Sequence, residues 1–212
     1  MLLQDPFGVI HTAADGRILQ VLARADTWFG IAQVWELSNI SSRDQVRRAL
    51  ARLAADGILD EERVASMYRY RLNQEHLLAG PLQEISTTRE RFLGQLTSTL
   101  GSWPDLVYAA LFGSAARNDM RPGSDVDIFL VRSDDALFRD ITDEAWDERV
   151  LALEYHVSRW TGNSSNVLHL RESEVRVAGD IDALANVRRE GIPLVGDKVW
   201  LVKALHHGGS TG

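Results

Sequence analysis

Apolar residues in the N-terminal part of the chain recur with the spacing of short amphipathic helices. Two such segments are Asp15–Ala25 and Gly30–Leu37. A third helix is predicted after Ser41 or Ser42, either of which can cap its first turn. It ends at Gly57, a residue that readily takes the left-handed backbone conformation at a helix end. Its apolar stripe consists of Val46, Leu50 and Leu53.

A β-hairpin is predicted directly after the third helix. Ile58 and Leu59 begin one strand, an acidic run and a turn near Ala65 follow, and Met67–Leu72 then alternates along a second strand. Three helices followed by a hairpin within about 60 residues are typical of a winged helix-turn-helix domain. We therefore expect residues 1–76 to form such a domain.

Arginines gather on the third predicted helix and on the last predicted strand, away from their apolar stripes. Basic side chains at these positions favour binding of double-stranded DNA through its phosphates. The alternative is a solvated basic face on an ordinary helical domain, and the acidic Asp60, Glu61 and Glu62 at the wing would be repelled by phosphate. The candidate DNA-contacting residues are Ser42, Arg43, Arg47, Arg48, Arg52, Arg69 and Arg71.

This segment also resembles the winged-helix regulators of the multiple-antibiotic-resistance and arsenic-responsive types. The resemblance rests on Ser42, on the run Val46–Leu50, on Gly57–Leu59 and on Tyr70–Asn73. It implies DNA binding, and we expect a homodimer on a palindromic site because such domains commonly read paired half-sites.

A connecting helix is expected over residues 77–101. Its apolar residues keep a helical period after Pro81, and Gly101 closes the segment. The sequence leaves open whether this helix packs two domains together or forms the seam of a dimer. The periodic residues are Leu82, Ile85, Phe92, Leu96 and Leu100.

Two strands with a polar stretch between them are predicted next. Leu106–Phe112 is apolar throughout, as expected of a strand buried on both faces, and it leads into Gly113 and Ser114. The second strand begins at Asp125. Because strand side chains alternate, Asp125 and Asp127 point to the same side.

These residues suit metal-dependent chemistry on a nucleotide. Gly113 lets the backbone approach a phosphate closely, and Ser114 and Arg117 add a hydroxyl donor and a positive charge. Two carboxylates on one side of a strand are costly without a cation between them. Mg²⁺ is commonly held by one or two carboxylates together with substrate phosphates. A triphosphate site beside Asp125 and Asp127 indicates nucleotidyl transfer by two-metal chemistry with Mg²⁺ or Mn²⁺, in which one ion activates the acceptor hydroxyl and the other binds the triphosphate.

The same segment resembles the DNA polymerase beta superfamily of nucleotidyltransferases, which carries the pattern Gly-Ser-x-Ala-Arg-Gly followed by Ser-Asp-x-Asp. Similar motifs occur in minimal, antitoxin-like nucleotidyltransferases and in aminoglycoside nucleotidyltransferases. The resemblance implies a mixed sheet flanked by helices, two catalytic and metal-binding aspartates, and a phosphate-binding site formed by Gly113, Ser114, Arg117 and Ser124. The matching residues are Gly113, Ser114, Ala116, Arg117, Ser124, Asp125 and Asp127.

The chain departs from this superfamily pattern at two places. Asn118 stands where glycine is usual, and the strand Asn166–Leu170, which should supply a third carboxylate to complete the metal site, contains no acid. A histidine in that strand could serve as a substitute base, although a lone histidine in a strand is more often structural. The polar residues in or just beyond the strand are Asn166, His169, Glu172 and Glu174.

The formal net charge of −7 at first argues against a nucleic-acid partner. Residues 1–73, however, contain nine basic and nine acidic side chains, so the excess negative charge lies entirely in the second part of the chain. The absence of cysteine excludes disulfides and thiolate metal sites. No apolar run approaches the roughly 20 residues of a membrane span, and we expect a cytoplasmic protein.

The expected fold class is α+β. We expect a winged helix-turn-helix domain over residues 1–76, a connecting helix over 77–101, and a nucleotidyltransferase fold over 102–212. The expected function is a DNA-binding regulator whose second domain binds an NTP with Mg²⁺ and transfers its nucleotidyl group to a hydroxyl on a protein, an RNA or a small molecule.

Two other functions are consistent with the motifs. The missing third carboxylate favours a catalytically degenerate transcription factor that only senses nucleotide. The chain could also be an antibiotic-modifying nucleotidyltransferase, although a DNA-binding front domain suggests a regulatory setting.

Overall fold

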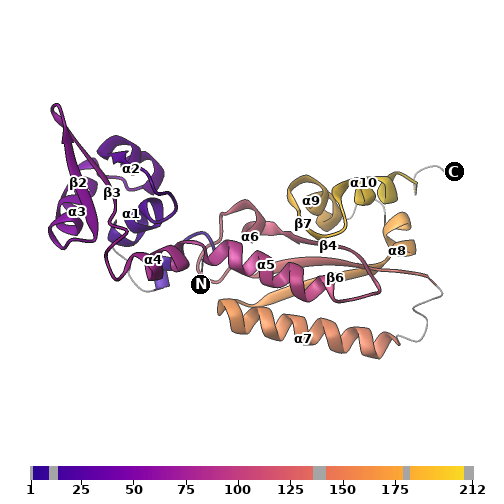
Figure 1. Cartoon of the computed structure of the whole chain (residues 1–212). Helices are drawn as coiled ribbons and strands as arrows, with labels where there is room; N and C mark the ends of the chain where they lie inside the picture. The colour runs from indigo at the N-terminus through magenta and orange to yellow at the C-terminus, as the bar shows by residue number, and fades with distance from the viewer. Residues whose placement is uncertain (1, 10–13, 136–141, 179–181, 208–212) are drawn as a thin grey trace. The chain divides into compact units, whose positions relative to one another are not determined.

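The computed structural model of the chain describes residues 2–9, 14–135, 142–178 and 182–207 (Figure 1). It contains two compact units, Met1–Glu90 and Arg91–Gly212. Among the described residues, no helix has both the length and the apolar character needed to cross a membrane.

Unit 1, Met1–Glu90, combines helices with a three-stranded antiparallel sheet. Strand β3 lies in the middle of this sheet, and its Tyr70 is paired with Phe29 of β1 on one side and Glu61 of β2 on the other. The elements are η1 (Pro6–Val9), α1 (Ala14–Leu22), β1 (Phe29–Gly30), α2 (Ile31–Ser38), α3 (Arg43–Ala55), β2 (Leu59–Val64), β3 (Met67–Leu72) and α4 (Ala79–Ser86).

The predicted helices and hairpin of unit 1 are present, and local contacts explain where α3 begins and ends. Ser42 precedes the helix, and its Oγ accepts a hydrogen bond from the backbone N–H of Gln45 at 3.3 Å. Gly57 lies just beyond the helix with φ +76°. The apolar face of α3 is buried in one core with Tyr70 and Leu72 of the hairpin. Local sequence signals therefore set the ends of this helix.

Where the sequence periodicity predicts one connecting helix over residues 77–101, the structure has two. α4 ends at Ser86, and α5 spans Thr88–Gly101. The hydroxyl of Thr87, between them, bonds back to carbonyl groups of the preceding turn, which satisfies the end of α4. The boundary between the two units falls within α5, after Glu90.

Unit 2, Arg91–Gly212, is built on a four-stranded sheet of order β6-β5-β4-β7. Strands β5 and β6 are parallel, whereas β4 is antiparallel to both β5 and β7. This arrangement confirms the expected α+β class with a mixed sheet. The elements after α5 are β4 (Leu106–Phe112), α6 (Gly113–Arg117), β5 (Val126–Arg132), α7 (Asp143–Thr161), β6 (Ser165–Arg171), α8 (Glu172–Val177), α9 (Asp182–Glu190), β7 (Ile192–Val195) and α10 (Lys198–His207).

Helices cover both faces of this sheet. In Figure 1, α7 lies on one side of the strands, and α9 and α10 lie on the other. Tyr108 and Phe129 pack in one core with Leu184 of α9 and Leu201 of α10. The central strands β4 and β5 are therefore buried on both faces, as their continuous apolar sequences predict. The buried stripe of α7 consists of Trp146, Val150, Leu153, Val157 and Thr161.

A buried ion cluster links the start of β4 to the end of β5 and to α7. Asp105 is fully buried, and its carboxylate accepts a hydrogen bond from Arg149 at 2.9 Å and lies 3.7 Å from Nε of Arg132. Arg132 is itself only 5% exposed, and it also pairs with Asp143 of α7 at 2.8 Å. Charges removed from water in this way are stable only while they remain partnered.

We expect Asp105→Asn to lower the free energy of unfolding by about 3 kcal/mol, because two buried or half-buried arginines lose a counter-charge. Urea unfolding followed by tryptophan fluorescence measures this effect. The control is Asp147→Asn, which removes the same charge from an exposed position on α7 and should change stability by less than about 0.5 kcal/mol. Equal effects of the two substitutions would show that Asp105 has no special role.

Candidate active site

The turn between β4 and α6 brings the backbone against a carboxylate. Phe112 ends β4, and Gly113 follows with φ +69°, in the left-handed region. A Cβ atom on Gly113 would overlap the Oδ2 atom of Asp127. Both the backbone conformation and this close approach require glycine. Ser114 comes next, in the short helix α6, and is partly exposed.

Asp127 lies between two neighbouring strands at one end of the sheet. It is the second residue of β5 and is paired with Phe112 of β4 and with Asn166 of β6. Burial raises the pKa of Asp127 above its usual value, and the charge of Asp125 adds to this shift. A hydrogen bond from Asn166 and the positive charge of Arg117 act in the opposite direction. The structure thus brings the two predicted carboxylates together, and it places that of Asp127 where its negative charge is disfavoured.

An amide side chain, that of Asn166, occupies the position on β6 beside the two carboxylates. Its Nδ2 donates a hydrogen bond to Oδ2 of Asp125 at 3.2 Å and lies 3.5 Å from Oδ1 of Asp127. Within the described ranges, no group of three or more histidine, aspartate or glutamate residues could hold a metal ion. Asn166 is therefore the residue that stands where the sequence pattern lacks its third acid.

The predicted phosphate-binding residue Arg117 is held by acidic side chains. Its Nε donates a hydrogen bond to Asp119 at 3.1 Å, and its Nη1 pairs with Glu190 at the end of α9. The hydrogen bond to Asp119, followed by the contact with Glu190, raises the pKa of Arg117. Sequence reasoning missed Glu190, because 73 residues separate it from Arg117 and only the fold brings α9 against α6.

The loop between α6 and β5 explains two features of the sequence. Asn118 has φ 61°, a conformation that glycine adopts freely and that asparagine tolerates better than most residues. Asparagine therefore fits where the superfamily pattern has glycine. Ser124 accepts a hydrogen bond at Oγ from the backbone N–H of Arg121 at 2.9 Å, and its carbonyl accepts one from Asn163. Ser124 thus shapes the entry to β5, and its contact with phosphate stays a prediction.

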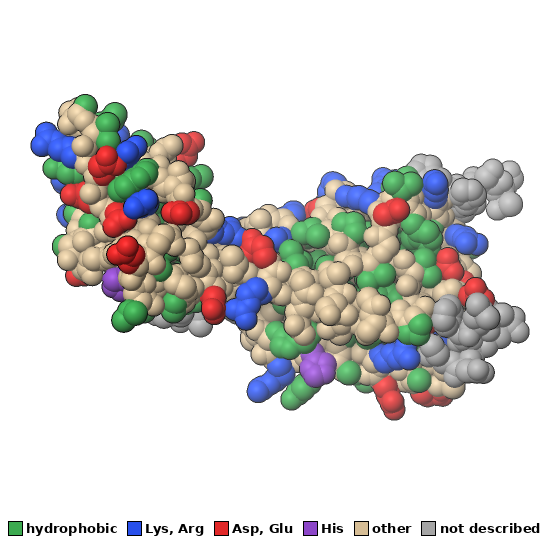
Figure 2. Space-filling view, in the orientation of Figure 1, with side chains coloured by type: hydrophobic (Ala, Val, Ile, Leu, Met, Phe, Trp, Pro, Cys, Tyr) green, Lys and Arg blue, Asp and Glu red, His purple; other side chains and the backbone are tan. Residues whose placement is uncertain are grey.

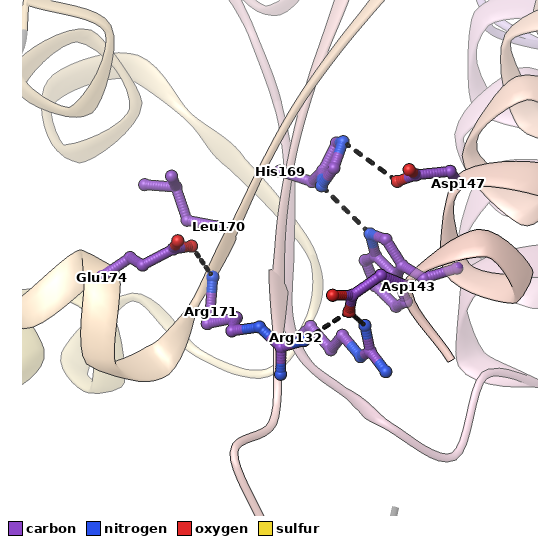
Figure 3. Close-up of a pocket in the computed structure, with 8 residues that line it drawn as sticks. Arg132, Asp143, Asp147, His169, Leu170, Arg171 and Glu174 are labelled. Atoms are coloured by element: carbon purple, nitrogen blue, oxygen red, sulfur yellow. Dashed lines mark hydrogen bonds and ion pairs between the residues drawn. The ribbon is translucent and has the colours of Figure 1, made fainter. Parts of the chain in front are cut away.

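His169 does not lie beside the carboxylates. It is paired with Leu130 of β5, so its side chain lies on the opposite face of the sheet from that of Asp127. Its Nδ1 accepts a hydrogen bond from Trp146 at 3.1 Å, and its Nε2 lies 3.9 Å from Asp147 (Figure 3). His169 therefore has a structural role, and the alternative of a substitute base is wrong.

A cavity of about 310 Å³ lies beside His169, at the carboxyl ends of β5 and β6. Arg132 and Arg171, the last residues of these strands, both point toward Asp143 at the start of α7 (Figure 3). The length of β5 between Asp127 and Arg132 is roughly 17 Å. This cavity is therefore separate from the carboxylate pair.

Glu172 and Glu174 also lie at this far end of the strands. Glu172 accepts a hydrogen bond from Oγ of Ser133 at 3.3 Å. Glu174 accepts one from the backbone N–H of Arg171 at 2.7 Å and so caps α8. Neither glutamate takes the place of the missing third carboxylate.

Three of the candidate DNA-contacting arginines of α3 are paired with acids of the same unit. Asp44 pairs with Arg47 at 2.7 Å and with Arg48 at 3.4 Å, and Arg52 pairs with Asp15 of α1. The hydrogen bond with Arg47, and then the charge of Arg48, lower the pKa of Asp44. Acidic and basic side chains are interspersed on the face of unit 1 seen in Figure 2.

The arginines of the hairpin are neutralised in the same way. Arg69 pairs with Glu62 at 2.6 Å and Arg71 with Asp60 at 2.9 Å, across the two strands. Their guanidinium groups lie 5.0 and 4.7 Å from the ring centre of Trp28. Two of the three acids expected to repel phosphate, Asp60 and Glu62, therefore partner arginines proposed to bind it.

Residues 97–185 match the nucleotidyltransferase domain family. This match contains the Gly113–Ser114 turn, which the sequence predicts to bind phosphate, and both aspartates, and it confirms the nucleotidyltransferase resemblance for this part of the chain. No curated protein matches the sequence.

Several solved structures are similar to about half of the chain. One is a toxin–antitoxin with AMP-PNP, with 20% identity, a TM-score of 0.37, and coverage of 55% of this chain and 84% of that one. A mutant of the toxin–antitoxin MntA–HpeT has 18% identity, a TM-score of 0.38, and coverage of 54% and 84%. A nucleotidyltransferase candidate from Sulfolobus solfataricus has 22% identity, a TM-score of 0.27, and coverage of 50% and 81%.

We expect Gly113→Ala to be more damaging than Gly123→Ala. Both glycines have positive φ, so each substitution should cost about 1–2 kcal/mol of backbone strain. A Cβ atom at Gly123 meets nothing within 4 Å, whereas one at Gly113 displaces the Asp127 carboxylate. Thermal unfolding and titration with a fluorescent NTP analogue and Mn²⁺ should show that only Gly113→Ala also loses nucleotide binding. Parallel losses of binding in both variants would contradict this assignment.

Proposed function

We propose that unit 2 binds a nucleoside triphosphate together with Mg²⁺ or Mn²⁺ and transfers its nucleotidyl group to a hydroxyl acceptor. The main support is that Gly113, Asp125 and Asp127 lie together at one end of the sheet, within a stretch that matches the nucleotidyltransferase domain family. The acceptor class is a protein, an RNA or a small molecule.

The turn at Gly113 supports the binding of phosphate. The absence of a side chain there leaves backbone N–H groups open to an anion, and the Ser114 hydroxyl adds a donor. Arg117 lies one turn further on, near enough to Asp127 to influence its pKa. Arg117 would exchange one of its acidic partners, Asp119 or Glu190, for a phosphate oxygen.

The two carboxylates fit one divalent ion bound together with phosphates. Asp125 and Asp127 offer the hard oxygen ligands that Mg²⁺ prefers, and their two negative charges lie close enough together for a cation between them to be stabilising. A divalent ion bound there would supply positive charge against the phosphates during transfer.

The proposed transfer exchanges one phosphorus–oxygen bond for another. The acceptor oxygen forms a bond to the α-phosphorus, and the bond from that phosphorus to the oxygen bridging the β-phosphate breaks. Pyrophosphate leaves, and the hydroxyl proton passes to water. In this reaction Ser114 and Arg117 hold the phosphates, while Gly113 and Asn166 keep the Asp127 carboxylate in place.

A second candidate function is nucleotide sensing without transfer. The observation that favours it is Asn166, a neutral amide beside the two carboxylates where the superfamily pattern has an acid. A regulator that binds NTP and releases it unchanged needs the phosphate site and one ion, but it does not need the full set of metal ligands.

Incubation with Mg²⁺ and α-³²P-labelled NTPs, in the presence of cell extract as a source of acceptors, tests the proposal. We expect label on an acceptor with the wild type and none with Asp127→Asn, because that substitution removes a charged ligand. Asp147→Asn, on the opposite face of the sheet, should leave labelling unchanged. Tight NTP binding without any labelling supports the sensing function, and the absence of NTP binding contradicts both functions.

We further propose that unit 1 is a winged helix-turn-helix domain that binds double-stranded DNA, as a homodimer on a palindromic site. The succession of α1, α2 and α3, followed by the β2–β3 hairpin, supports this proposal. The ion pairs of the arginines do not prevent DNA binding, because an exposed pair contributes only about 0–1 kcal/mol and phosphate can replace the acid. The arginines proposed to change partners are Arg47, Arg48, Arg69 and Arg71.

Because Asp44 pairs with both Arg47 and Arg48, substitutions on α3 can be designed either to weaken or to strengthen DNA binding. We expect Arg47→Ala with Arg48→Ala to weaken binding to the promoter of the protein's own gene by tenfold or more, and to reduce the salt dependence by roughly two phosphate contacts. Asp44→Ala should strengthen binding, because it frees both arginines. Arg159→Ala with Arg188→Ala, at two exposed positions of unit 2, removes the same charge and serves as the control. Affinity that is unchanged in both the arginine and the Asp44 variants would show that α3 does not contact DNA.

A further inference from the structure

Asn166 is placed where one side chain reaches both proposed metal ligands. Its position opposite Asp127 in the parallel β5–β6 pair aims the two side chains to the same face of the sheet. From there its Nδ2 lies 3.2 Å from Asp125 and 3.5 Å from Asp127. Asn166 is exposed, so the contacts with the two aspartates, and not packing in a hydrophobic core, hold its side chain in this position.

The Asp127 carboxylate is constrained on two sides. Its Oδ1 faces Asn166, and its Oδ2 packs against the backbone of Gly113, where even a Cβ atom would not fit. Asp125 is tied to the same amide through Oδ2. Asn166 therefore holds two like-charged groups together, a task that a bound cation performs in other sites.

The charge of this cluster limits the number of cations that it can bind. Two aspartates supply two negative charges and the amide supplies none, whereas a two-metal site holds a second divalent ion about 3.5–4 Å from the first. The affinity of such sites depends on the number of charged ligands. In the described part of the chain, no third acid or histidine completes a metal-binding group here.

We propose that Asn166 restricts this site to a single divalent ion, the one that binds with the triphosphate, and that it positions the two carboxylates when this ion is absent. The inference rests on the proposed binding of NTP and a divalent ion by Asp125 and Asp127. As a consequence, no second ion is available to activate the acceptor hydroxyl. Nucleotidyl transfer is therefore slow compared with the time for which NTP stays bound.

The number of bound Mn²⁺ ions tests this proposal directly. The full chain is titrated with Mn²⁺ in the presence of a saturating non-hydrolysable NTP analogue, and bound ions are counted by electron paramagnetic resonance. We expect one ion for the wild type and two for Asn166→Asp, with the spin coupling of ions a few ångströms apart. Asn166→Ser, which removes the amide without adding charge, should bind one ion about tenfold more weakly.

Two results would overturn the inference alone: a wild type that binds two coupled ions, or an Asn166→Asp variant that still binds one. Absence of Mn²⁺ from the wild type, or binding that survives Asp127→Asn, contradicts the proposed nucleotide site and the inference with it. Thermal unfolding checks that each variant is folded, which the exposure of Asn166 leads us to expect. Asn166→Glu places a different carboxylate at the same position and should likewise bind two ions.

Discussion

The close approach of the Gly113 backbone to the Asp127 carboxylate is the contact on which the arrangement of unit 2 depends. Strands β4 and β5 are antiparallel, and Phe112 at the end of one is paired with Asp127 at the start of the other. The turn that we propose to bind phosphate and a side chain that we propose to bind the metal ion therefore lie side by side. The cost is visible in the raised pKa of Asp127, because its charge is half-buried beside that of Asp125. Carboxylates whose pKa is shifted by burial and by a neighbouring charge are often found at functional sites.

In both units, several of the arginines proposed to bind phosphate are paired with acids. Arg117 is shared between Asp119 and Glu190, and Asp44 serves both Arg47 and Arg48. The pairs of Asp44 with Arg47 and Arg48, and the pair of Arg117 with Asp119, are exposed, so they are weak and can be exchanged for phosphate at small cost. The two anionic ligands that we propose, a triphosphate and DNA, would thus bind by replacing acidic side chains. The buried cluster around Asp105 differs. Replacing an ion-pair partner there would leave a buried charge with neither a counter-charge nor water to stabilise it.

Much of the fold follows from short segments of sequence. The Ser42 cap, the glycine after α3 and the two apolar strands of unit 2 were all predicted from neighbouring residues, because hydrophobic period and capping act within a few positions. The break at Thr87 was not predicted, since the apolar period continues through it and only a side-chain hydrogen bond interrupts the helix. Glu190 was missed for a different reason: its partner Arg117 is distant in sequence.

The sequence by itself determined the mixed α+β class, the glycine turn and the pair of aspartates on one strand, because these depend on alternation and spacing within a segment. Only the tertiary structure decided which residue stands beside that pair. The order and register of β5 and β6 place Asn166 next to Asp127, and they place His169 on the opposite face against Trp146. Contacts between strands depend on packing across the whole sheet, and no local pattern in the chain specifies them.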